Sequence, residues 1–137
     1  MKLNIASLLI IAIFVVAYFW TTSSLPWTPG RIAGLAIAAP ALLLLVVARL
    51  QLGGAFSVRP KASHLVTTGL YARIRNPIYL FGSLFVVGLA ILIGVPWLLL
   101  FLVVIIPLQI VRSRKEAEVL EAKFGDEYRA YRQKTWF

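Results

Sequence analysis

Four long apolar runs decide what this 137-residue chain can fold into. They cover residues 4–20, 31–51, 77–94 and 96–111, and each approaches the roughly 17 to 25 residues that a helix needs to cross a bilayer. Interfacial tryptophans can extend the shorter first and fourth runs. The chain is 61% hydrophobic and only 14% charged, which lies outside the usual range of soluble domains on both counts. We therefore predict an all-α integral membrane protein, a single domain over residues 1–137 with four transmembrane helices. The connection Gly94-Val-Pro96 between the third and fourth runs is so short that we expect these two helices to pack antiparallel.

The first run also has the character of a secretory signal peptide, because Lys2 precedes an apolar stretch. However, residues 18–24 lack the small-x-small pattern of a cleavage site, and the run is long for the apolar region of a signal peptide. We therefore interpret it as a membrane span.

The positive charges predict how the spans are oriented. Of the 14 Lys and Arg residues, 13 precede the first run, lie between the last turn of the second run and the start of the third, or follow the fourth, and only Arg31, at the start of the second run, lies on the opposite side. Basic residues collect on the cytoplasmic side of membrane proteins. We expect a protein of the cell (inner) membrane with both termini, the loop at 53–76 and the tail at 112–137 in the cytoplasm. Topology thus accounts for the net charge of +9, and we predict no nucleic-acid partner.

The tail has a different composition from the spans. It holds all five acidic residues of the chain. Ala117, Leu120 and Phe124 recur at the spacing of one helix face, which predicts an amphipathic cytoplasmic helix over residues 112–123. Gly125 stands where a glycine commonly ends a helix, and a short second helix is expected after it.

Several common kinds of site are excluded by what the chain lacks. It has no cysteine and one histidine, so it cannot build the usual zinc sites, and we predict no metal. It has no glycine-rich dinucleotide fingerprint and no phosphate-binding loop. The only aspartate lies far along the tail, and no nucleophile elbow is present.

Polar side chains gather instead on the predicted cytoplasmic side. Asn76, Tyr79 and Ser83 share one face of the third predicted helix, with Gly82 beside them. Each polar residue also has a structural interpretation, such as interfacial anchoring by a tyrosine or a surface ion pair at i, i+4. The loop and the tail add four further side chains at the same level: His64, Tyr71, Arg112 and Glu116.

These residues form a pattern that resembles a known family. His64-Leu-Val-Thr-x-Gly-x-Tyr71, Arg75-Asn-Pro-x-Tyr79 and a glutamate-led tail motif from Glu116 to Tyr131 resemble the isoprenylcysteine carboxyl methyltransferase-like family, a relative of the phospholipid methyltransferases. The resemblance spans about residues 60 to 136. It implies a membrane-embedded methyltransferase that uses S-adenosylmethionine, held in a pocket at the cytoplasmic face.

The resemblance also implies which residues would form the site. Glu116 would offset the positive charge of the cofactor, hold its amino group, or act as a base. Arg75 or Arg112 would bind the cofactor carboxylate or an anionic group of the substrate. The residues implied to bind the cofactor are His64, Leu65, Val66, Gly69, Tyr71, Asn76, Pro77, Tyr79 and Glu116.

Two departures from the family pattern bear on the substrate. Asn76 stands where the carboxyl methyltransferases have histidine, and Ala117 stands where they have a second glutamate. An amide can hydrogen-bond a ligand but cannot titrate near neutral pH. We therefore expect a lipid or lipophilic small molecule from the bilayer as methyl acceptor rather than a prenylated cysteine. No oligomeric state is predicted.

Two other functions remain as alternatives. Membrane sterol and steroid reductases share a similar helical architecture and a related Arg-x-Pro-x-Tyr element but use NADPH, although this chain is short and offers little room for a dinucleotide. The second alternative is a non-enzymatic membrane scaffold or lipid-binding protein.

Overall fold

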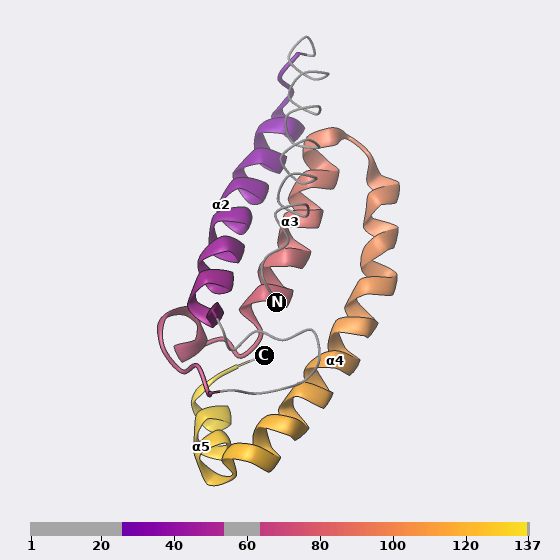
Figure 1. Ribbon diagram of the computed structural model, residues 1–137. Coiled ribbons are helices and arrows are strands. Elements are labelled where there is room, and N and C mark those ends of the chain that lie inside the picture. Colours follow the sequence, from indigo (N-terminus) through magenta and orange to yellow (C-terminus); the bar gives the residue numbers. More distant parts are fainter. Residues whose placement is uncertain (1–25, 54–63, 137) are drawn as a thin grey trace.

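The computed structural model describes residues 26–53 and 64–136, and these residues are almost entirely helical (Figure 1). The predicted span at residues 4–20 lies outside the described residues. In order along the chain, the elements are α2 (Pro29–Leu52), the 3-10 turn η2 (Gly69–Ala72), α3 (Pro77–Ile93), the 3-10 turn η3 (Pro96–Leu99), α4 (Leu100–Phe124) and α5 (Asp126–Lys134). Within these ranges the only β contact is a single parallel bridge between Ile74 and Trp136. The all-α prediction is confirmed for this part of the chain.

The helices have the lengths and composition expected of a membrane protein only in part. Two described segments, Pro29–Leu52 and Pro96–Phe124, are long and apolar enough to cross a membrane. The helix α3 is apolar but has only 17 residues.

The helices α2 and α3 run antiparallel and pack closely together (Figure 1). Gly34 on α2 lies against the backbone of Leu92, and Gly88 on α3 lies against Ala38. Without side chains at these two positions the helix backbones can approach each other, as is common where helices meet in membranes. The other buried residues of α2 are also small, namely Ala38, Ala41 and Ala48.

The helix α4 stands apart from this pair. It runs antiparallel to α3 (Figure 1), as the short connection at residues 94–96 predicts, but it has no buried residue. The expectation that the third and fourth spans pack against each other is therefore wrong over most of their length. The reason is that Gly88, the small residue that lets α3 approach another helix closely, faces α2 rather than α4.

The fourth predicted span and the predicted tail helix are parts of one element. Residues 100–124 form one continuous helix, so α4 joins the apolar run directly to the tail. The change from apolar to charged residues near position 112 alters the surroundings of the helix but not its backbone, because residues 108–124 contain no glycine or proline to interrupt it.

The turns and helix ends follow from local sequence signals. Asn76 precedes α3, and Pro77 is its first residue, as the restricted backbone of this pair predicts. Gly125 separates α4 from α5 with a φ of 52°, and Gly69 begins η2 with a φ of 61°. Residues with a side chain rarely adopt such positive φ angles, which explains glycine at both positions.

Candidate functional site

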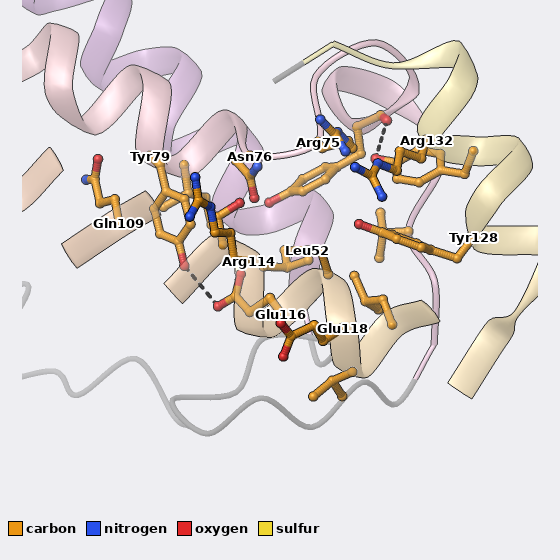
Figure 2. A pocket seen from close by; sticks show the side chains of 18 of the residues that line it. Leu52, Arg75, Asn76, Tyr79, Gln109, Arg114, Glu116, Glu118, Tyr128 and Arg132 are labelled. Carbon is orange, nitrogen blue, oxygen red and sulfur yellow. Dashed lines mark hydrogen bonds between the residues drawn. The ribbon is translucent and has the colours of Figure 1, made fainter. Parts of the chain in front are cut away.

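A pocket of about 730 Å³ lies at the end of the molecule where α5, η2 and the first turn of α3 meet the second half of α4 (Figure 2). Its walls come from segments far apart in the sequence: the loop at residues 64–76, the first two turns of α3, residues 106–121 of α4, and α5. The pocket is thus the place where the polar face of the third predicted helix meets the tail.

Glu116 is the hydrogen-bonding centre of this pocket. The Tyr79 hydroxyl donates to Glu116 Oε1 at 2.9 Å, a bond that joins α3 to α4 (Figure 2). The Arg112 Nε donates to the same oxygen at 2.8 Å. Because both bonds end on Oε1, the second carboxylate oxygen, Oε2, has no hydrogen bond to any described residue and can accept one from a ligand.

Arg75 presents a buried polar atom without a partner. Its Nε is buried and has no hydrogen bond to any residue in the ranges 26–53 and 64–136. A buried guanidinium nitrogen in this state is unfavourable, and an anionic group in the pocket would satisfy it. The backbone of Arg75 is fixed from outside the pocket, because its N–H donates to the carbonyl of Trp136 at 3.4 Å.

The loop wall of the pocket is positioned by α2. His64, Leu65, Val66 and Tyr71 line it, and the turn that carries Tyr71 is held by Gln51 at the end of α2. The Gln51 Oε1 accepts a hydrogen bond from the backbone N–H of Leu70 at 2.8 Å. A side chain at Gly69 would collide with Gln51, so this glycine serves the turn rather than the ligand.

The C-terminal segment clasps the same turn from the other side. The Tyr131 hydroxyl donates to the Tyr71 carbonyl at 2.7 Å, and both residues are buried. The Trp136 N–H donates to the Arg73 carbonyl at 3.0 Å. Burial, and next the neighbouring Tyr128, raise the pKa of Tyr131 to about 12, so its hydroxyl keeps its proton at neutral pH. Burial is also the main cause that raises the pKa of Tyr71 above its usual range.

Removal of the Tyr131 hydroxyl is expected to loosen this clasp. In Tyr131→Phe the buried Tyr71 carbonyl loses its side-chain donor, at a cost of about 1 to 3 kcal/mol. Hydrogen exchange of the Arg75 and Trp136 amides should accelerate by about tenfold, since both lie in the clasp. The matched control is Tyr128→Phe, because Tyr128 makes no described hydrogen bond. Equal exchange in the two variants would rule out the clasp.

Most of the residues predicted from the sequence come together at this pocket, although 37 residues separate Tyr79 from Glu116. Three of them do not line it. Gly69 forms the turn, Pro77 is fully buried at the start of α3, and Arg112 lies outside the lining although it hydrogen-bonds Glu116. The predicted residues that do line the pocket are His64, Leu65, Val66, Tyr71, Arg75, Asn76, Tyr79 and Glu116.

Several lining residues were not predicted as site residues. Gln109 is the only polar residue in the apolar run over 98–111, a signal that could have identified it. Tyr128 and Tyr131 were part of the recognised motif without an assigned role. Nothing in their sequence context distinguishes the other polar lining residues from ordinary tail residues: Ser113, Arg114, Glu118, Glu121 and Arg132.

The fold and the pocket define a class of protein: one that is all-helical in its described part apart from a single β bridge, with two helices long and apolar enough to cross a membrane and a ligand-sized pocket of mixed polar and apolar lining at one end of them. Residues 30–127 match the family model described as phospholipid methyltransferase. The chain belongs to this family, which implies a membrane methyltransferase and confirms the family resemblance. No curated protein and no solved structure shows significant similarity to the chain.

Proposed function

We propose that this protein transfers a methyl group from S-adenosylmethionine to a lipid or lipophilic acceptor at the cytoplasmic face of the cell membrane. The observation that carries the proposal is the pairing of two unmet polar atoms in one pocket, Glu116 Oε2 and Arg75 Nε. A carboxylate can bind the ammonium group of an amino-acid moiety, and a guanidinium can bind its carboxylate. The two groups in one cavity therefore fit such a moiety.

The residues present fit this cofactor. Arg75 Nε can donate to its carboxylate, and Glu116 Oε2 can accept from its ammonium group or lie against its sulfonium. Leu65, Val66 and Tyr71 supply an apolar and aromatic wall for its base. The volume of about 730 Å³ lies within the range of small-molecule sites.

When bound, the cofactor supplies a methyl group on a sulfonium, which is already reactive toward nucleophiles. The protein's contribution is therefore mainly positioning and exclusion of water. Tyr79 and Arg112 fix the Glu116 carboxylate from α3 and α4. If the nucleophile carries a proton, Glu116 Oε2 is placed to accept it.

The apolar part of the pocket wall supports a lipophilic acceptor. Ile106 and Ile110 line the pocket and are exposed, and both belong to the apolar segment of α4 that is long enough to cross a membrane. Asn76 and Ala117 line it as well. Because they replace the histidine and the second glutamate of the carboxyl methyltransferases, we propose an acceptor other than a prenylated cysteine.

The charge distribution supports the cytoplasmic side. All described basic residues except Arg31 lie at the end of the helices that holds the pocket, whereas Arg31 lies near the start of α2, at the far end (Figure 1). Under the positive-inside rule the pocket faces the cytoplasm, where the cofactor is made.

The test is ligand binding by the full-length protein in detergent. S-adenosylhomocysteine should raise the melting temperature in proportion to its affinity and concentration, whereas NADPH should not. Stabilisation by NADPH alone would favour a reductase. No stabilisation by either ligand would favour the non-enzymatic alternative.

A further inference from the structure

The apolar segments around the pocket contain two isolated polar side chains. Ser83 is the only polar residue of α3 after Tyr79, and Gln109 is the only polar residue over 98–111. A polar side chain inside an apolar span carries a free-energy cost, and its position therefore points to a function.

These two side chains meet each other across the pocket. The Ser83 Oγ donates to Gln109 Oε1 at 3.2 Å in a partly buried contact, and both residues line the pocket beside Ile106 and Ile110. Figure 2 shows Gln109 at the end of the pocket away from Arg75. The amide nitrogen of Gln109 has no hydrogen bond to any described residue, so its N–H donors are available.

A purely structural role explains this pair poorly. Polar pairs can join membrane helices, but α4 has no buried residue and makes little contact with α3. A pair that served only to join helices would also not explain why the amide N–H donors of Gln109 have no acceptor among the described residues. A ligand group that accepts hydrogen bonds would satisfy them.

The positions on both helices place this pair deeper in the apolar region than the Glu116 centre. Ser83 follows Tyr79 by four residues on α3, about 6 Å along the axis, and Gln109 precedes Glu116 by seven on α4, about 10 Å. The two polar pairs therefore form two levels of the pocket, roughly 6 to 10 Å apart.

We propose that Ser83 and Gln109 form an acceptor subsite that binds a neutral oxygen, such as a carbonyl or hydroxyl, of the lipid to be methylated. This inference rests on the proposed function. Gln109 donates to the oxygen, and Ser83 orients the amide by occupying Oε1. The acceptor then carries a second polar oxygen about 6 to 10 Å from the atom that receives the methyl group. A lipid whose only polar group is the nucleophile has no such oxygen.

The test measures transfer of a tritiated methyl group from S-adenosylmethionine into a bacterial total lipid extract. Gln109→Leu should lower the label in the lipid product about tenfold and leave the affinity for S-adenosylhomocysteine within about twofold. Ser83→Ala should have a smaller effect, because the amide donors remain. Gln109→Asn, which keeps an amide, should recover part of the transfer.

The control is Leu108→Ala, which changes an exposed residue next to Gln109 that does not line the pocket; it should behave as the wild type. Unchanged transfer by Gln109→Leu would overturn the subsite, as would a parallel loss of cofactor affinity. Wild-type protein that binds S-adenosylhomocysteine but labels no lipid would also overturn it, and would leave the cofactor site standing. Failure of the wild type to bind the cofactor would instead overturn the proposed function.

Discussion

Glu116→Gln is expected to lower kcat/KM for methyl transfer by about 100-fold or more, the range seen when a preorganised electrostatic contact is removed from an active site. The substitution keeps the shape of the side chain and both donors to Oε1, the Tyr79 hydroxyl and Arg112 Nε. It removes the negative charge and the second carboxylate acceptor. The affinity for S-adenosylhomocysteine should fall less than the rate, because the product lacks the positive sulfonium.

This loss should not arise from unfolding. The side chains of Arg112 and Glu116 are 40% and 30% exposed, so water screens their ion pair, and such pairs contribute at most about 1 kcal/mol. The melting temperature of Glu116→Gln should therefore stay within about 3 °C of the wild type.

The control makes the same chemical change elsewhere in the tail. Glu127 is exposed in the first turn of α5 and does not line the pocket, so Glu127→Gln should keep full activity. A Glu116→Gln variant that bound the product normally and kept full turnover would exclude a role for this carboxylate in catalysis.

The features that the sequence predicts well are those that local chemistry determines. The Asn76–Pro77 pair favours a helix start, because the residue before proline avoids the helical region and proline suits the first helical position. The positive φ of Gly125 is required by the tight change of direction between α4 and α5. The apolar runs likewise predict the helices, because backbone groups in a membrane must be hydrogen-bonded within their own segment.

The features that the sequence does not predict depend on tertiary contacts. The hydrogen bond between Tyr131 and Tyr71 joins residues 60 positions apart, and no periodicity indicates it. The Ser83–Gln109 pair is similar, because each residue is visible as an exception within its own span but nothing shows that the two exceptions meet. The expected packing of α3 on α4 was wrong because a short connection fixes direction, whereas side-chain size fixes which helices come into contact.

The small residues between α2 and α3 lead to the second large prediction. Gly88→Ala is expected to destabilise the protein by about 1 to 3 kcal/mol or more. A methyl group at this position would lie 2.8 Å from the Cα of Ala38. The obstacle is backbone of α2, which cannot rotate aside as a side chain can, so the two helices must separate. Since small residues provide the close packing here, separation loses van der Waals contacts along the interface.

The chain offers a matched control for this change on the same helix. A methyl group at Gly82 would meet nothing within 4 Å, so Gly82→Ala should be neutral or slightly stabilising, because alanine favours the helix. The melting temperature in detergent should therefore fall by about 5 °C or more for Gly88→Ala and stay unchanged or rise for Gly82→Ala. Equal melting temperatures would show that α2 and α3 do not pack as described.

The same substitution should also affect activity. Because α3 carries Tyr79 and Ser83, a shift of this helix against α2 would move both polar levels of the pocket. Gly88→Ala should thus lose methyl transfer even below its melting temperature, although Gly88 does not line the pocket.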